Sequence, residues 1–261
     1  MARAIDINCD MGESFGAYTL GMDEDVIRSI SSANIACGFH ASDPMVMERT
    51  VRLCRDHKVG AGAHPGYPDL MGFGRRHLEI SPAELNNYVI YQVGALKGFL
   101  SLYDLPLQHV KLHGALYNDL VSKTDLFLLL AHQLHKAFGP IVFLTLATKH
   151  GSLLKEKARQ DGLRIALEAF PDRQYTDEGT LAPRNLAGAV LHDPEQIAER
   201  AVAMVLKNGC ESINGRWLDI EVDTLCIHGD NPTSITAAKI MVAAFAREGI
   251  DIKPLGDIIP I

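Results

Sequence analysis

The feature that most constrains the fold is a repeated alternation of short apolar runs with helix-like stretches. Each run is rich in β-branched or small apolar residues and leads into a helical pattern, directly or through a loop. The predicted strands cover residues 4–10, 32–38, 59–64, 109–114, 140–147, 164–170 and 224–229. Because composition does not change along the chain, this alternation predicts one α/β domain with a parallel sheet.

Four predicted helices begin with a capping side chain followed by a proline, which suits the first helical position. These pairs are Asp43-Pro44, Ser81-Pro82, Asp193-Pro194 and Asn231-Pro232. Glu84 and Gln196 also stand at the capping-box spacing from Ser81 and Asp193. These signals fix where the helices start.

The phase of the strands favours a closed barrel over an open sheet. A strand covered by helices on both faces is apolar on both phases, whereas a barrel strand can turn one phase into a polar lumen. Residues 4–10 alternate Ile5, Ile7 and Cys9 with Asp6, Asn8 and Asp10, and residues 109–113 alternate in the same way. Residues 140–147 are apolar on both phases, so the polar lumen would be lopsided. We predict a single domain, residues 1–261, folded as a parallel (β/α) barrel of seven strands that need not be regular.

Composition and charge exclude several classes of function. The net charge of -7 and the lack of a basic tract argue against nucleic-acid binding. No stretch approaches the roughly 20 apolar residues of a membrane span, and residues 1–10 enter a strand pattern without the regions of a signal peptide. The five cysteines form no CxxC pair and are expected to be buried thiols. We therefore expect a cytoplasmic enzyme without nucleic-acid or membrane partners.

Residues with chemical potential gather where the predicted strands end. They stand in the segments Asp10–Glu13, Cys37–His40, His64–Tyr67, Lys111–Gly114, Glu168–Arg173 and His228–Asn231. In a parallel barrel the carboxyl ends of the strands form the catalytic face. Six separate segments are therefore expected to converge on one mouth.

Each of these polar residues also has a structural explanation. The histidines at the mouth are His40, His64, His113 and His228, and their recurrence at one structural position favours function over capping. Asp6 and Asn8 are explained equally well by a polar network inside the barrel, whereas Asp10 is more indicative of catalysis. Glu13 could simply cap a turn.

Two connections, residues 65–80 and 172–192, are long enough to suggest active-site walls. Arg75, Arg173 and Arg184 in these loops are either anion clamps or structural links. The chain has no P-loop, no strand-linked GxGxxG and no GxSxG segment. The motifs that remain are those of a carboxylate and histidine site.

The mouth segments together resemble the LamB/YcsF family. The matching blocks are DINCDMGESFG, ANIACGFHASDP, GAHPGYPDLMGFGRR, HVKLHGALYN, EAFPDRQYTDEGTLAPR and CIHGDNP, in this order from residue 5 to residue 232. Leu112 stands where the family has proline, Ile227 where valine is usual, and Pro171 where alanine is common. None of these departures removes a chemically active group.

The resemblance implies a barrel related to the glycoside hydrolase/deacetylase superfamily. It also implies an ATP-dependent 5-oxoprolinase activity, in which 5-oxo-L-proline, ATP and water give L-glutamate, ADP and phosphate. Two further subunits, B and C, are implied as partners. Because the chain lacks a recognisable nucleotide-binding motif, we expect no activity from it alone.

The implied reaction needs acid/base groups, an oxyanion stabiliser and an anchor for the substrate carboxylate. The candidate acid/base groups are Asp10, His40, His64 and His113, and Lys111 is the candidate oxyanion stabiliser. The candidate substrate-binding residues are Asn8, Glu13, Arg75, Glu168, Arg173, Arg184, His228 and Asp230.

Two other functions stay open at this stage. One is a metal-dependent, deacetylase-like hydrolase that acts alone, with a divalent ion such as Mg²⁺ held by Asp10, His40 and His64. The other is a non-catalytic subunit that mainly supports its partners. The many polar groups at one barrel mouth speak against the second.

Overall fold

The computed structural model describes residues 3–229 and 232–259, and its centre is a closed parallel barrel. The barrel strands are β1 (Arg3–Met11), β2 (Ser32–Ala36), β3 (Gly60–His64), β4 (His109–Lys111), β5 (Val142–Leu146), β6 (Arg164–Ala169) and β9 (Thr224–Ile227). Each strand pairs in parallel with the next, and β9 pairs with both β6 and β1, which closes the ring. The predicted seven-stranded barrel is confirmed.

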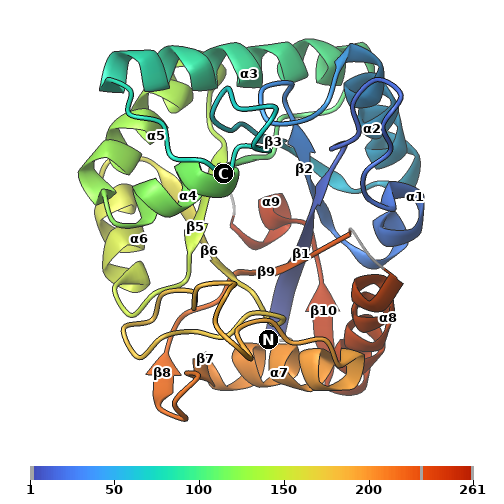
Figure 1. The fold of residues 1–261 in the computed structure, drawn as a ribbon, viewed down its shortest axis with the longest axis vertical. Helices are drawn as coiled ribbons and strands as arrows, with labels where there is room; N and C mark the ends of the chain where they lie inside the picture. The colour runs from blue at the N-terminus through green and yellow to red at the C-terminus, as the bar shows by residue number, and fades with distance from the viewer. Residues whose placement is uncertain (1–2, 230–231, 260–261) are drawn as a thin grey trace.

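Helices surround this barrel (Figure 1). They are α2 (Pro44–His57), α3 (Pro82–Leu102), α4 (Gly114–Val121), α5 (Thr124–Phe138), α6 (Gly151–Gln160), α7 (Pro194–Lys207) and α8 (Pro232–Arg247), with the short α1 (Asp23–Val26) and the 3-10 turn η1 (Ile27–Ser29) after β1. None of the helices in the described part of the chain has the length and apolarity that a membrane crossing requires. All five cysteines are buried and free, as predicted.

The predicted helix starts are confirmed where the structure describes them. Asp43 and Asp193 each accept backbone N–H bonds from the first turn of their helix, and Ser81 forms a complete capping box with Glu84. The predicted cap Asn231 lies outside the described residues, although α8 begins at Pro232 as expected.

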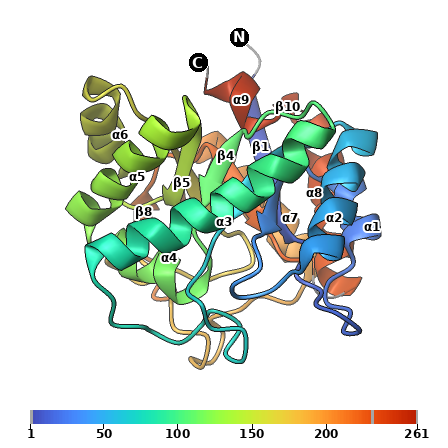
Figure 2. The ribbon, with the colours of Figure 1, turned by 90° about the horizontal axis from the view of Figure 1, so that it is seen from above.

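Several elements were not predicted from the sequence. β7 (Gly209–Glu211) and β8 (Trp217–Asp219) form an antiparallel hairpin, and β10 (Ile250–Ile252) pairs with the first residues of β1. The short helix α9 (Leu255–Ile258) lies at the centre of the ring in Figure 1, and Figure 2 shows it at one end of the barrel with the long loops at the other. These loops therefore surround the open mouth, while α9 covers the opposite end.

Apolar side chains fill the part of the barrel next to α9. Val142 and Leu144 of β5 form a buried cluster with Ala166 of β6 and Leu255 of α9. This cluster explains why β5 is apolar on both phases. The side chains that point into the barrel from β5 pack against α9, which plugs this end, instead of lining a polar lumen.

The remaining lumen is polar and fully hydrogen bonded at its base. The Asp6 carboxylate accepts bonds from the hydroxyls of Ser31, Ser32 and Thr224, at 2.7, 2.6 and 2.5 Å. One step closer to the mouth, Asn34 bridges Asn8 and His109. These contacts show that Asp6 and Asn8 do form the interior network that was one of the two predicted explanations.

A testable consequence concerns Asp6. Burial raises the pKa of its carboxyl group to about 6. In the unfolded chain the group titrates at about 4, so between these values the folded protein binds more protons and its stability falls as pH rises. We expect Asp6→Asn to gain stability relative to the wild type as pH rises from 4 to 7.5, by on the order of 2 kcal/mol. Chemical denaturation at both pH values measures this. The exposed Asp56→Asn is the control, and equal changes in both variants would contradict the expectation.

Candidate active site

The centre of the mouth is an ion-paired group contributed by three strands. Lys111 Nζ from β4 lies 3.0 Å from Asp10 Oδ1 of β1 and 2.8 Å from Glu168 Oε1 of β6. The Lys111 side chain is 4% exposed and that of Glu168 is fully buried, whereas 25% of the Asp10 side chain is exposed. Asp10 is therefore the member of this group that a ligand in the mouth can reach.

These charges support each other electrostatically. Burial alone raises the pKa of Asp10, but nearby His64 and Lys111 hold it well below its usual range. Burial works against the charged form of Lys111, yet Asp10, Cys226 and Glu168 raise its pKa well above the ordinary value. Asp10 is consequently ionised and Lys111 protonated at neutral pH.

Neighbouring polar groups fix the positions of these ions. Asn34 donates to Asp10 Oδ1 at 2.9 Å, Tyr117 donates to Glu168 Oε2 at 2.9 Å, and Lys111 also donates to Asn8 Oδ1 at 3.3 Å. Asn34 and Tyr117 were not among the predicted site residues. Asn34 lies on the polar phase of its strand, which was a usable signal, whereas Tyr117 lies on a helix and gave none.

Three histidines and one glutamate form a second group beside Asp10. His64 Nε2 lies 3.3 Å from Asp10 Oδ2 and 3.0 Å from His113 Nδ1, while Glu13 Oε1 lies 3.2 Å from His40 Nε2 and 3.6 Å from His113 Nδ1. One donor atom from each of Glu13, His40, His64 and His113 lies within 4.8 Å of every other. These four residues come from four of the predicted mouth segments and form a group that could hold a metal ion. The ligand set predicted from the sequence was Asp10, His40 and His64.

Backbone contacts orient two of these rings. His64 Nδ1 lies 2.8 Å from the carbonyl oxygen of Lys111, and His113 Nε2 lies 2.8 Å from that of Phe73. A carbonyl only accepts, so both of these nitrogens carry a proton. Gly74 makes the approach of the 65–80 loop possible, because its φ is +62° and a Cβ there would lie 2.8 Å from atoms of both His40 and His113.

Burial also sets the protonation of this group. It lowers the pKa values of His40 and His113 well below the ordinary value, and neighbouring imidazoles add to the effect. Burial, reinforced by Asp10, raises the pKa of Glu13. The two imidazoles are therefore neutral at physiological pH and have a lone pair available.

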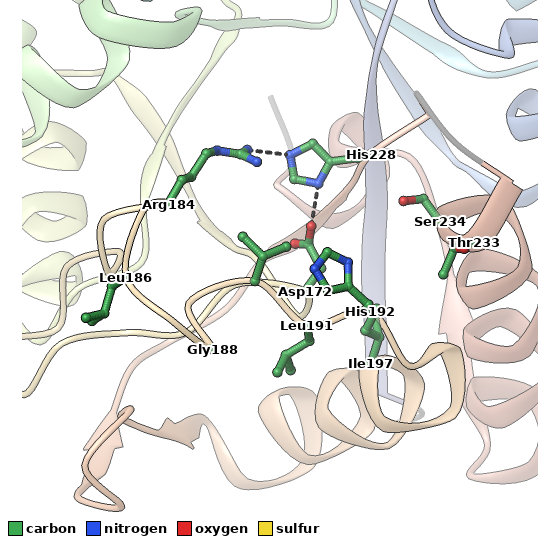
Figure 3. Close-up of a pocket in the computed structure, with 11 residues that line it drawn as sticks. Asp172, Arg184, Leu186, Gly188, Leu191, His192, Ile197, His228, Thr233 and Ser234 are labelled. Carbon is green, nitrogen blue, oxygen red and sulfur yellow. Dashed lines mark hydrogen bonds and ion pairs between the residues drawn. The ribbon is translucent and has the colours of Figure 1, made fainter.

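A third group forms one wall of the mouth. His228 Nδ1 lies 2.5 Å from Asp172 Oδ2, and Arg184 Nη2 lies 3.2 Å from His228 Nε2. Figure 3 shows Arg184 beside the His228 ring and Asp172 below it, each next to a different ring nitrogen. Asp172 raises the pKa of His228. The phenyl ring of Phe170 links this wall to the centre, since it contacts both His228 and Lys111.

The wall borders a cavity of about 490 Å³. It is lined by Asp172, Arg184, Leu186, Gly188, Val190, Leu191, His192, Ile197, His228, Thr233 and Ser234. Most of these residues belong to the predicted 172–192 connection, which folds as an ordered wall with antiparallel bridges at Arg173–Val190 and Tyr175–Leu181.

The remaining predicted site residues are Arg173, Arg75 and Asp230. Arg173 is buried and donates to the carbonyl oxygen of Ala182, so it links its own loop. Arg75 is exposed, with its guanidinium 5.1 Å from the centre of the Phe73 ring. Asp230 lies outside the described residues. Asp172 lies in the predicted Glu168–Arg173 segment but was not among the selected site residues, and it is an additional candidate.

The mouth combines an ionised carboxylate, neutral imidazoles and a wall that contains an arginine. Such a set can move protons and hold an anionic ligand. Fold and site together define an α/β-barrel protein with clustered carboxylates and imidazoles at the carboxyl ends of its strands.

Comparison with known proteins places the chain more narrowly. The model of the LamB/YcsF family matches residues 5–259, and the chain belongs to this family. It is 49% identical over 255 residues to a Pyrococcus furiosus protein named as the A subunit of 5-oxoprolinase, covering 98% of this chain and 99% of that protein. A protein of the same name from Heliobacterium modesticaldum is 50% identical over 250 residues, which is 95% and 97% of the two chains.

A solved structure supports the same placement. The lactam utilization protein from Thermus thermophilus superposes with a TM-score of 0.87 at 41% identity, over 96% of this chain and 99% of that one. This similarity in fold and sequence extends over nearly the whole barrel.

The ion-paired centre predicts unequal effects of two substitutions. Lys111→Met leaves the buried Glu168 without a counter-charge and should destabilise the protein by roughly 3–5 kcal/mol. Asp10→Asn leaves Lys111 paired with Glu168 and should cost about 1 kcal/mol. Thermal melts of both variants, with the exposed Lys136→Met as control, test this order. An Asp10→Asn variant less stable than Lys111→Met would contradict it.

Proposed function

We propose that this chain is the A subunit of an ATP-dependent 5-oxoprolinase. With partner subunits B and C it opens the lactam ring of 5-oxo-L-proline to give L-glutamate, and ATP is hydrolysed to ADP and phosphate. The observation that carries this proposal is the shared name of relatives that are about 49% identical over nearly their full length. The complex is expected to be cytoplasmic.

The chemistry of a lactam explains why the reaction needs both ATP and an acid–base site. A five-membered lactam is a resonance-stabilised amide, so its carbonyl must be activated before water attacks. Phosphorylation of the carbonyl oxygen by ATP provides that activation, and proton transfer is then needed at the attacking water and at the departing nitrogen. The mouth of the barrel offers proton acceptors and donors for these steps.

The residues of the centre can be given separate roles in this scheme. Asp10 is ionised and partly exposed, so we assign it the role of general base. Lys111 is almost fully buried between two carboxylates. It therefore positions Asp10 and keeps it charged, instead of contacting the substrate oxygen as first predicted. Glu168 and Asn8 hold Lys111 in turn.

The wall is assigned to the substrate carboxylate. Arg184 is exposed at the cavity, and its guanidinium lies beside His228. An arginine binds a carboxylate with two parallel hydrogen bonds, which also orients the ligand. Asp172 fixes the His228 ring on its other side. Arg75 is the second candidate anchor, because it is exposed at the opposite loop.

A metal-dependent hydrolase that acts without ATP is the second candidate function. The observation in its favour is the group of Glu13, His40, His64 and His113, because imidazole and carboxylate ligands are common in metal-dependent hydrolases. The two functions differ in a simple way: such an enzyme would hydrolyse its substrate alone and without nucleotide. A purely supporting role is disfavoured, because buried charges at a mouth are costly to maintain without use.

The proposed function predicts a strict dependence on partners and nucleotide. We expect glutamate formation only when the A, B and C proteins are mixed with ATP and 5-oxoproline, because this chain has no recognisable nucleotide-binding motif. Omitting each component in turn and measuring glutamate and phosphate tests the proposal. Glutamate formation by this chain alone and without ATP would favour the second candidate.

The assigned roles predict different kinetic defects in the assembled enzyme. Asp10→Asn should lower kcat by about 100-fold or more, the scale of a lost acid–base group. Arg184→Gln should instead raise KM for 5-oxoproline by roughly 10- to 100-fold, the scale of a lost charged hydrogen bond. The control is Arg76→Gln, because Arg76 is exposed and paired with Asp69. Wild-type kcat in a folded Asp10→Asn variant would rule out the assigned base.

A further inference from the structure

The arrangement of the two oriented histidines points to a positive centre between them. His64 carries its proton on Nδ1 and His113 on Nε2, because each of these atoms faces a backbone carbonyl oxygen at 2.8 Å. When these two atoms carry no further proton, His64 Nε2 and His113 Nδ1 face each other with their lone pairs 3.0 Å apart. Two lone pairs held this close repel each other unless a proton or a metal ion lies between them.

The surrounding carboxylates add to the requirement for a cation. His64 Nε2 also faces Asp10 Oδ2 at 3.3 Å, and Glu13 Oε1 lies 3.6 Å from His113 Nδ1. Among the described residues, only the imidazoles of His40 and His113 lie within ion-pair distance of Glu13. A divalent ion at this point would contact Glu13 Oε1 and both facing nitrogens at once.

We propose that His64 Nε2, His113 Nδ1 and Glu13 bind one first-row divalent transition metal, with the remaining coordination positions facing the mouth. Ligands bound to zinc at about 2.0–2.1 Å lie about 3.0–3.4 Å from each other at coordination angles of roughly 90–109°. Two of the three donor separations, 3.0 and 3.6 Å, lie near this range, and all three are within 4.8 Å. Two imidazoles and one carboxylate suit zinc or iron better than Mg²⁺, which prefers six oxygen ligands.

His40 is excluded from this ligand set by the orientation of its ring. The rings of His40 and His113 are stacked 3.6 Å apart with an angle of 2° between their planes. An imidazole nitrogen binds a metal in the plane of its ring, and two parallel planes share no point, so one ion cannot be bound well by both. His40 Nε2 instead lies 3.2 Å from Glu13 Oε1 and can donate to it. His40 is therefore a positioning residue that orients a ligand.

This assignment differs from the ligand set predicted from the sequence, which was Asp10, His40 and His64. His64 remains a ligand, whereas Glu13 and His113 replace Asp10 and His40. Asp10 lies next to the proposed ion, because it contacts His64. A metal at this place would act as a Lewis acid on a ligand that reaches Asp10.

The test is metal binding by the wild-type chain after treatment with a chelator. We expect calorimetry and metal analysis to show about one tightly bound Zn²⁺ per chain, and Co²⁺ to give the visible absorption of a protein-bound ion. The measurement needs neither ATP nor partner subunits, so its outcome is independent of the proposed function. Absence of saturable binding by the wild type would overturn the site and leave a shared proton as the centre.

Variants separate ligands from the positioning residue. His64→Gln, His113→Gln and Glu13→Gln should each weaken Zn²⁺ binding by more than about 100-fold, whereas His40→Gln should weaken it by roughly 10- to 100-fold. The control is the exposed His132→Gln. If a histidine variant fails to fold, Glu13→Gln still decides, because 18% of the Glu13 side chain is exposed and the substitution is nearly isosteric. Unchanged binding in folded Glu13→Gln, or stronger loss in His40→Gln than in His113→Gln, would refute the assignment.

Discussion

The structure depends on one ammonium group placed between two carboxylates inside a barrel. Lys111 joins β4 to β1 through Asp10 and to β6 through Glu168, so it links strands that are not neighbours in the ring. Because a buried ion requires a partner, these charges specify the relative positions of three strand ends. The same constraint that orders the barrel also keeps Asp10 ionised at the mouth.

Two further layers of side chains lie inside the barrel between this charged layer and α9. Next to α9 the packing is apolar, through Leu255 and Leu144. Above it, hydroxyl and amide groups satisfy Asp6 and Asn8. The polarity of the interior therefore increases towards the mouth, and the groups with unused hydrogen-bonding capacity lie where a ligand can enter. The order of these layers places the proposed acid–base site at this end.

The strand pattern was enough to predict the barrel and the convergence of Asp10, Lys111 and the histidines. That prediction succeeded because side chains alternate strictly along a strand, so the polar phase is readable from sequence alone. The pairing of Lys111 with Glu168 was not predictable, since it depends on how the barrel closes. The plug α9 was missed because a helix of four residues leaves no periodic signal. Arg173 could have linked its own loop or bound an anionic ligand. The choice depends on loop geometry, which no sequence pattern encodes.

The orientation of the histidines shows most clearly what sequence could not supply. The sequence placed His40, His64, His113 and His228 at the same position, where a predicted strand ends. In the structure the carbonyl oxygens of Lys111 and Phe73 determine which nitrogen of His64 and His113 is free, and stacking on His113 turns His40 away from a shared ion. Chemically identical side chains thus acquire different binding roles from the backbone atoms that orient them. The chemistry of this mouth is determined as much by those carbonyl groups as by the imidazoles they orient.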